Sequence, residues 1–220
     1  MVRNMNNVKA FVLALAIGIG LAIQCTGVNA RDMQVLTVAG GCFWCVEADF
    51  EKVRGVQEVV SGYTGGTVAN PTYRQVTGGG TGHYEAVQII YDADQVSARR
   101  LYDLFFRSVD PTDAGGQFCD RGDSYRTAIF VSDPAQQQDA EAAKSAAEAE
   151  LGQPIVTPIL SAGPFYTAED YHQDYYRGTD IILTRAGPKS QAAAYDFYRE
   201  ACGRDQRVRQ LWGGDAPFVN

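Results

Sequence analysis

The chain has 220 residues and a formal net charge of −7, with 45% apolar and 20% charged residues. This length and apolar content are sufficient for one folded domain with a proper core, and they exclude a disordered chain. No run of four or more basic residues occurs, so the sequence predicts no binding to nucleic acid. The acidic balance mainly favours solubility.

The first thirty residues have the pattern of a secretory signal. Arg3 and Lys9 give a basic start, residues 10–23 are apolar throughout, and Val28-Asn29-Ala30 offers the small residues that a signal peptidase reads. The apolar run is shorter than the roughly 20 residues of a spanning helix, so we expect no stable membrane span. We therefore expect a cleaved signal peptide at 1–30, export to the periplasm, and a single domain at 31–220.

Strands and helices are predicted to alternate along the rest of the chain. The predicted strands cover residues 35–39, 56–63, 83–91, 125–132 and 154–161. The predicted helices cover 43–54, 95–108, 134–151, 168–177 and 189–202, of which 134–151 is expected to be exposed. This alternation indicates an α/β or α+β protein with two layers, and it leaves a doubly wound sheet open. The long Gly-rich loops at 64–82 and 110–123 are expected to build a site.

The segment Gly40-Gly41-Cys42-Phe43 places a cysteine where a glycine turn leads a strand into a helix. Unpaired backbone N–H groups at a helix N-terminus stabilise an anion. We therefore expect the Cys42 thiol to be acidified and its thiolate to act as a nucleophile. The alternative is a small buried apolar side chain, which is the usual place of a free cysteine.

Cys45 lies three residues after Cys42, on the same side of the first helical turn. A C-x-x-C at a helix start is also the layout of thioredoxin-like oxidoreductases, although the matching cis-proline loop is not identifiable here. A general thiol–disulfide oxidoreductase using these two cysteines is therefore the alternative function. A zinc site needs four ligands, and because no second C-x-x-C or H-x-x-H pair occurs, we expect no metal.

Glu85 lies within the predicted strand at 83–91, where alternation places it on the same face as Val87 and Ile89. A carboxyl group desolvated by apolar neighbours has a raised pKa, and a carboxylic acid still protonated near neutral pH can donate a proton. We therefore expect Glu85 to be a proton donor. The alternative is a paired and solvated glutamate at a strand end.

Two of the twelve tyrosines lie on Gly-rich loops that flank predicted strands. Tyr73 follows the turn signal Asn70-Pro71-Thr72, and Tyr125 follows Cys119-Asp120-Arg121-Gly122. For each tyrosine alone, an ordinary surface position is also consistent with the sequence.

Four cysteines remain after removal of residues 1–30, and they allow three pairings: Cys42, Cys45, Cys119 and Cys202. An exported protein can form disulfides, but a domain of this size does not need them for stability. We therefore consider reactive thiols as well supported by the sequence as structural disulfides.

Six motifs occur in a fixed order along the chain. They are G-C-F-W-C at 41–45, G-Y-T-G-G at 62–66, N-P-T-Y-R at 70–74, G-H-Y-E-A at 82–86, S-Y-R-T-A-I-F at 124–130 and P-F-Y-T-A-E-D-Y-H-Q-D-Y at 164–175. Together they closely resemble the class A peptide methionine sulfoxide reductases, over about residues 36 to 176.

The resemblance implies roles for the matching residues. Cys42 matches the nucleophile, and Glu85 matches the acid that protonates the sulfoxide oxygen. Tyr73 and Tyr125 match hydroxyl groups that hydrogen-bond this oxygen.

Further matches concern substrate binding. Phe43 and Trp44 match the walls of an apolar pocket for the methyl group on the substrate sulfur, and Asp120 matches an acidic residue that anchors the site and the substrate. Glu47 is expected to support the structure rather than the chemistry.

For the whole chain, the resemblance implies a two-layer sandwich with a mixed, largely antiparallel sheet and a ferredoxin-like core. It implies reduction of methionine S-sulfoxide, free or in proteins, to methionine through a Cys42 sulfenic acid and a disulfide, without a cofactor. A thioredoxin-like dithiol protein is the implied reductant. A monomer is the default expectation.

The cysteine that resolves the sulfenic acid is the point where the chain departs from the family. Members often carry one in a C-terminal Gly-rich tail, whereas here Cys202 lies in what is predicted as a helix end. The candidates are Cys202, Cys119 and Cys45. A sulfoxide-binding or structural homologue without turnover is a third possible class, which the presence of both Cys42 and Glu85 disfavours.

Overall fold

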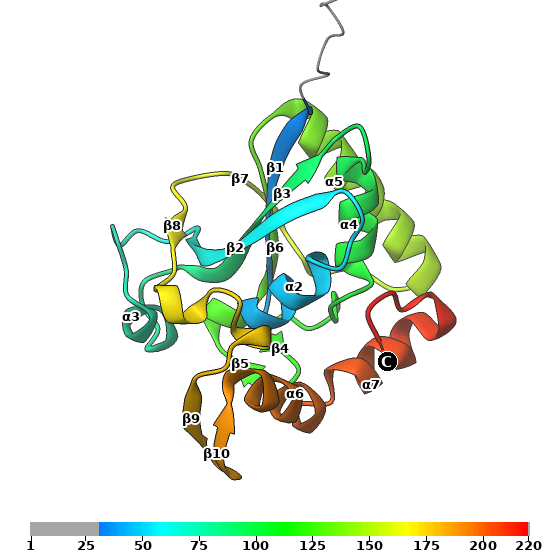
Figure 1. The fold of residues 1–220 in the computed structure, drawn as a ribbon. Coiled ribbons are helices and arrows are strands. Elements are labelled where there is room, and N and C mark those ends of the chain that lie inside the picture. The colour runs from blue at the N-terminus through cyan, green and yellow to red at the C-terminus, as the bar shows by residue number, and fades with distance from the viewer. Residues whose placement is uncertain (1–30, 220) are drawn as a thin grey trace, which may run out of the picture. The chain divides into compact units, whose positions relative to one another are not determined.

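A six-stranded sheet forms the centre of the described part of the chain, residues 31–219, in this computed structural model. Its strands lie in the order β7-β6-β1-β3-β2-β8, and all neighbouring pairs are antiparallel except β6 and β7. The strands are β1 (Met33–Gly40), β2 (Val56–Thr64), β3 (Tyr84–Asp92), β6 (Thr127–Val131), β7 (Ile159–Ser161) and β8 (Tyr166–Thr167). The expected mixed, largely antiparallel sheet is therefore confirmed (Figure 1).

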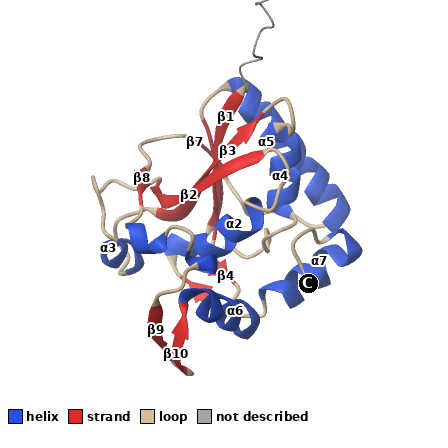
Figure 2. Cartoon of the chain, viewed as in Figure 1, coloured by secondary structure: helices blue, strands red, loops and turns tan. Residues whose placement is uncertain are grey.

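Three helices cover one face of this sheet. They are α2 (Phe43–Phe50), α4 (Ala98–Phe106) and α5 (Pro134–Leu151). All three contribute side chains to the large core that also contains Val87 and Ile89 of β3, and Figure 2 shows them beside the strands. The opposite face of β3 packs in a smaller cluster, in which Tyr84 and Ala86 contact Phe130. The side chains of β3 thus alternate as the sequence predicts, and the fold has two layers.

The expectation that helix 134–151 is exposed is wrong for one of its faces. Ala140, Ala143 and Ala147 recur at helical spacing and are buried in the large core. Their small side chains allow α5 to pack closely on α4. The helix begins after Asp133, whose carboxylate accepts the N–H groups of the first turn, and ends at Gly152 in the left-handed conformation.

Two predicted elements are shorter or different in the structure. The strand expected at 154–161 is limited to β7, because its flanking prolines lack N–H groups for a ladder. The helix expected at 168–177 is replaced by two 3₁₀ turns, η2 (Asp170–His172) and η3 (Tyr175–Arg177). They are separated by Asp174, whose φ is +55° and whose N–H binds the Glu47 carboxylate instead of a helical carbonyl.

The two Gly-rich loops contain short ordered elements. The first loop holds α3 (Tyr73–Thr77), which begins with a reciprocal capping box between Thr72 and Gln75. The second holds β4 (Gly116–Gln117), β5 (Asp120–Arg121) and the 3₁₀ turn η1 (Asp123–Tyr125). The buried Gln117 side chain fixes this second loop by bonding both the N–H and the carbonyl of Asp110. Both loops are therefore held in place rather than left as open coil.

The C-terminal part adds a hairpin and two helices. The hairpin consists of β9 (Ile181–Thr184) and β10 (Gly187–Ser190), and the helices are α6 (Gln191–Ala201) and α7 (Arg204–Trp212). The helix predicted at 189–202 corresponds to α6, whereas the hairpin and α7 were not predicted. A final 3₁₀ turn, η4, covers Gly213–Asp215.

No helix within residues 31–219 is both long and apolar enough to cross a membrane. The signal peptide predicted at 1–30 lies outside the described residues. The ferredoxin-like arrangement of the core stays a prediction.

Candidate active site

A tight turn between β1 and α2 presents Cys42. Gly41 has a φ of +79°, and a Cβ atom there would lie 2.5 Å from the Cβ of Gln117, so only glycine is accommodated. Cys42 follows as the N-cap residue of α2 and is half-buried. The second Gly-rich loop thus packs directly on the turn that carries the predicted nucleophile.

Glu85 lies at this turn from the adjacent strand β3. Its Oε2 accepts a hydrogen bond of 3.1 Å from the backbone N–H of Phe43, the residue that follows Cys42. The side chain is 1% exposed, and burial raises its pKa to about 8 despite the opposing effect of the Phe43 N–H. Glu85 is therefore a neutral acid at pH 7, held beside Cys42 by one backbone hydrogen bond.

The expectation that the helix N-terminus acidifies Cys42 is wrong. The pKa of Cys42 is raised above its usual value, by its hydrogen bond with Cys45, by burial, and by the charges of Cys45, Glu85 and Asp120. The first N–H group of α2, at Phe43, binds Glu85 and not the thiol. The pKa of Cys45 is instead lowered to about 7, first by the Cys42 hydrogen bond and, against burial, by Arg204 and Arg199.

An aromatic wall follows Cys42 along α2. The ring centroid of Phe43 lies 6.2 Å from that of Tyr73 and 5.1 Å from that of His172. Trp44 stacks on Tyr175 at 3.7 Å and donates its indole N–H to His172 Nδ1 at 3.2 Å. The two residues predicted to wall an apolar pocket therefore lie in one aromatic cluster with Tyr73.

Residues of the motif at 164–175 position this wall, a role that the sequence did not assign to any of them. Glu169 accepts the backbone N–H of Tyr73 at 2.9 Å and the hydroxyl of Tyr63 at 2.8 Å. His172 is buried, its pKa is lowered to about 4 by desolvation, and its neutral ring orients Trp44. The motif itself was a signal for these residues, but their contacts span about a hundred residues of sequence and were not readable from it.

Tyr125 and Asp120 come to the site from the second Gly-rich loop. Burial and the charge of Glu85 raise the pKa of both Tyr73 and Tyr125, so both phenols are hydrogen-bond donors at neutral pH. Burial raises the pKa of Asp120, while Arg204 opposes this shift. Cys42, Glu85, Tyr73 and Tyr125 therefore lie close enough for the charge of Cys42 or Glu85 to raise the pKa of each tyrosine.

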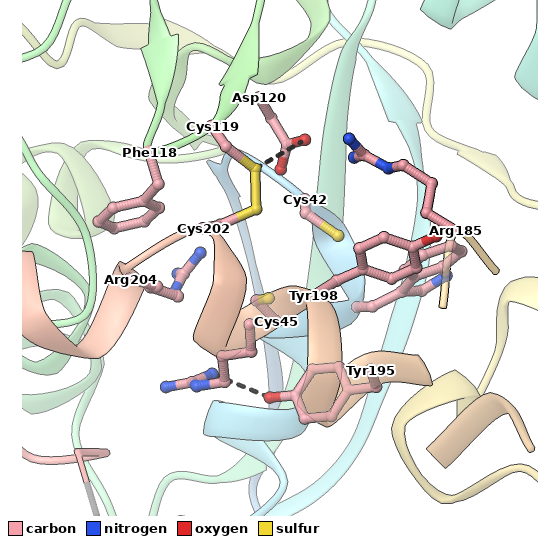
Figure 3. Close-up of a pocket in the computed structure, with 12 residues that line it drawn as sticks. Cys42, Cys45, Phe118, Cys119, Asp120, Arg185, Tyr195, Tyr198, Cys202 and Arg204 are labelled. Carbon is pink, nitrogen blue, oxygen red and sulfur yellow. Dashed lines mark hydrogen bonds between the residues drawn. A yellow bond between two sulfur atoms is a disulfide. The ribbon is translucent and has the colours of Figure 1, made fainter. Parts of the chain in front are cut away.

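All four cysteines of the described chain line one cavity of about 250 Å³ (Figure 3). Cys119 and Cys202 form a disulfide with Cα atoms 4.9 Å apart, and Cys42 and Cys45 are free thiols. Two of the three candidate resolving cysteines are therefore bonded to each other beside Cys42. The rest of the cavity wall consists of Trp44, Phe118, Asp120, Arg185, Tyr195, Tyr198, Arg199 and Arg204.

The contacts of Glu47 support a structural role for this residue. Its carboxylate accepts the Ser61 hydroxyl at 2.6 Å and the Asp174 N–H at 2.5 Å, and it joins β2 to the segment between η2 and η3. With Glu51 and Asp174 it forms the only group with metal-ligand spacing among residues 31–219. Glu51 binds the Tyr176 hydroxyl and Asp174 pairs with Arg177, so this acidic group is engaged in protein contacts.

Comparisons with known proteins identify the family of the chain. Residues 34–204 match the profile of the family described as peptide methionine sulfoxide reductase. The chain belongs to the peptide methionine sulfoxide reductase family. It is an oxidoreductase of this family, and it reduces methionine sulfoxide.

Individual relatives cover most of the chain. It is 49% identical to peptide methionine sulfoxide reductase MsrA 2 of Rhizobium meliloti (strain 1021), over 86% of this chain and 88% of that protein. It is 47% identical to MsrA of Bacillus subtilis (strain 168), over 84% of this chain and 98% of that protein.

Solved structures agree as well. Mxr1 of Saccharomyces cerevisiae in reduced form has a TM-score of 0.63 and 32% identity, and it covers 67% of this chain and 85% of its own length. Methionine sulfoxide reductase A of Corynebacterium diphtheriae has a TM-score of 0.62 and 30% identity, over 73% of this chain and 85% of its own.

Proposed function

We propose that Cys42 attacks the sulfur of methionine S-sulfoxide, free or in proteins, while Glu85 protonates its oxygen. The observation that carries this assignment is the hydrogen bond between Glu85 Oε2 and the Phe43 N–H, because it fixes a buried neutral acid one residue from the thiol. The S epimer is the one that the family resemblance implies.

The chemistry of a sulfoxide requires both groups. Its sulfur carries a partial positive charge and its oxygen a partial negative charge, so attack at sulfur needs a thiolate and departure of oxygen needs a proton. In this proposal, the phenols of Tyr73 and Tyr125 donate hydrogen bonds to that oxygen. The Phe43 and Trp44 rings hold the methyl group in this proposal, and Asp120 anchors the substrate.

A Glu85→Gln variant tests the acid. The glutamine oxygen keeps the Phe43 N–H bond, but the amide cannot release a proton, so we expect the rate of methionine formation to fall by about 10²- to 10³-fold. In the wild type, activity present below pH 8 is lost as the pH rises and Glu85 ionises. This loss should be absent from the residual activity of the variant.

The same variant separates the two candidate functions. A general thiol–disulfide oxidoreductase needs only the cysteines, so its exchange with a small disulfide substrate should be unaffected by Glu85→Gln. Loss of sulfoxide reduction with thiol exchange retained supports the reductase. Full sulfoxide reduction by the variant would contradict the assignment of Glu85.

The Cys119–Cys202 pair is proposed to complete the cycle. After attack, Cys42 is a sulfenic acid, and a thiol that condenses with it forms a disulfide and releases water. One cysteine of the pair bonds to Cys42, and the other displaces it, which leaves the Cys119–Cys202 disulfide and a free Cys42. Cys119 is exposed, so a thioredoxin-like dithiol protein can reach this disulfide and reduce it.

We propose further that residues 1–30 direct the chain to the periplasm, where a monomeric catalytic domain, 31–220, repairs oxidised proteins. The basic start and short apolar run support export. Expression of the full chain in a Gram-negative host should yield periplasmic protein with an N-terminus near Arg31 and the mass of one chain in solution. Cytoplasmic protein that retains residues 1–30 would contradict export.

A further inference from the structure

The tip of the β9–β10 hairpin contributes Arg185 to the wall of the cavity that contains the cysteines. Arg185 and Ala186 are the two residues between the strands. The Thr184 hydroxyl fixes this turn, because it accepts the Ala186 N–H at 3.1 Å and donates to the Gly187 carbonyl at 2.6 Å. Ile182 of β9 packs against a buried cluster that shares two residues with the cavity wall. Arg185 therefore extends from a turn that is held in place on both counts.

Arg185 has no anionic partner within residues 31–219. Its guanidinium carbon lies 5.9 Å from the centroid of the Tyr198 ring, a cation–π contact with another residue of the cavity wall. The two other arginines of this wall are engaged by the protein. Arg199 pairs with Asp49, and Arg204 donates to two backbone carbonyls. Arg185 is therefore the cavity arginine whose N–H groups are free to bind a ligand.

The charges of the cavity favour an anionic ligand. Its wall carries three arginines and one carboxylate, that of Asp120, although the chain as a whole has a formal net charge of −7. A concave surface with an excess of one charge attracts ligands of the opposite charge. Figure 3 shows Arg185 on one side of Cys42 and the Cys119–Cys202 disulfide on the other. An anion at Arg185 would thus share the cavity with the sulfoxide that Cys42 attacks.

The structure of the substrate connects these two positions. Only two methylene groups separate the sulfur of methionine from its Cα atom, so groups on the adjoining backbone stay close to the sulfoxide. A carboxylate is the anion that such a backbone carries. The planar guanidinium of arginine offers two parallel N–H donors that match the two oxygens of a carboxylate.

We propose that Arg185 is a specificity-determining residue that binds a carboxylate of the substrate next to the oxidised methionine. The inference rests on the proposed function and deepens it by naming a substrate class. The carboxylate is either the α-carboxylate of a free or C-terminal methionine sulfoxide or the side chain of an acidic residue that follows it in a peptide.

Single turnovers of the reduced protein separate binding of the substrate from its reduction. The rate of methionine formation is measured against the concentration of N-acetyl-methionine S-sulfoxide, which has a carboxylate, and of its N-methylamide, which has none. The half-saturating concentration reports binding, and the maximal rate reports the chemical step. For wild type, we expect the acid to half-saturate at a concentration about three- to tenfold lower than the amide.

Arg185→Met keeps a long side chain without the charge. It should remove the preference by raising the half-saturating concentration of the acid, and the effect should fall on this concentration rather than on the maximal rate. Lys189→Met is the matched control, because Lys189 lies on the same hairpin, contacts the Phe197 ring and does not line the cavity. The control should keep the wild-type preference. Acid and amide are compared on the same protein, so a smaller folded fraction cancels in their ratio.

A second pair of substrates identifies the source of the carboxylate. N-acetyl-methionine S-sulfoxide is joined to glutamate amide in one dipeptide and to glutamine amide in the other. A preference limited to the first pair assigns Arg185 to the α-carboxylate, and a preference for the glutamate dipeptide assigns it to acidic neighbours. The proposal is overturned by a wild type without preference in either pair, or by Arg185→Met with the wild-type preference. A wild type that forms methionine from none of these substrates contradicts the proposed function itself.

Discussion

Burial raises the pKa of three side chains in and around the active site, Cys42, Glu85 and Glu47, with different consequences. The pKa of Cys42, where a nucleophile is needed, is raised first by Cys45 and then by burial. Desolvation raises the pKa of Glu85 to about 8, where a proton donor is needed. The same effect raises the pKa of Glu47 to about 7, although the Ser61 and Asp174 hydrogen bonds oppose it. A raised pKa alone therefore does not distinguish a catalytic carboxyl group from a structural one.

At the residue scale, the raised pKa of Glu47 predicts how the stability of the fold changes with pH. Its folded-state pKa lies above its unfolded value, so the folded protein binds the extra proton and loses stability as the pH rises from about 4.5 to about 7. Glu47→Gln mimics the protonated form, since its amide can accept from the Asp174 N–H and donate to Ser61. Relative to wild type, the variant should gain up to about 3 kcal/mol of unfolding free energy between pH 5 and pH 8.

Urea unfolding at both pH values measures this difference. If the variant and the wild type differ in unfolding free energy by the same amount at pH 5 and at pH 8, Glu47 does not titrate in this range. Because the Ser61 and Asp174 contacts are retained in the variant, a uniform loss of stability would point to packing instead of ionisation.

At the scale of single elements, the sequence predicted those that follow a local period. The strand 83–91 and the helices at 43–54, 95–108 and 134–151 have clear apolar patterns, and each occurs in the structure within a few residues. The hairpin β9–β10 was missed because its strands have four residues each and one contains a proline. Helix α7 was missed because it is mostly polar and buries only Arg204, Val208 and Trp212.

In the active site too, features that depend on a local period were predicted and features that depend on distant contacts were not. Alternation along β3 correctly placed Glu85 on the buried face, since this needs only the period of a strand. The sequence predicted a lowered pKa for Cys42, whereas the structure raises it. The Phe43 N–H that was expected to stabilise the thiolate donates its hydrogen bond to Glu85 instead. Arg199 and Arg204 lie more than 150 residues from Cys42 in sequence, and nothing local indicates that they line the same cavity as Cys42 and Cys45.

At the scale of the whole molecule, the cavity beside Cys42 is assembled from distant segments. The second Gly-rich loop contributes Cys119, and the end of α6 contributes Cys202, 83 residues later. Their disulfide ties this loop to the C-terminal helices directly beside the free thiol of Cys42 (Figure 3). The C-terminal part therefore supplies Cys202, one half of the disulfide beside Cys42, and the buried arginines Arg199 and Arg204.

This arrangement predicts which intermediates can be trapped. If Cys119 and Cys202 relay oxidation from Cys42, removing either one should stop the relay after its first disulfide. Reaction of reduced Cys119→Ser with one equivalent of sulfoxide should give a Cys42–Cys202 disulfide if Cys202 attacks first, and Cys202→Ser should give Cys42–Cys119 if Cys119 does. The variant that lacks the attacking cysteine should instead accumulate sulfenic acid at Cys42. Mapping of disulfides by mass spectrometry reads all these products, and wild type should show Cys119–Cys202. A Cys42–Cys45 disulfide in wild type would contradict the relay, because Cys45 would then be the cysteine that condenses with the Cys42 sulfenic acid.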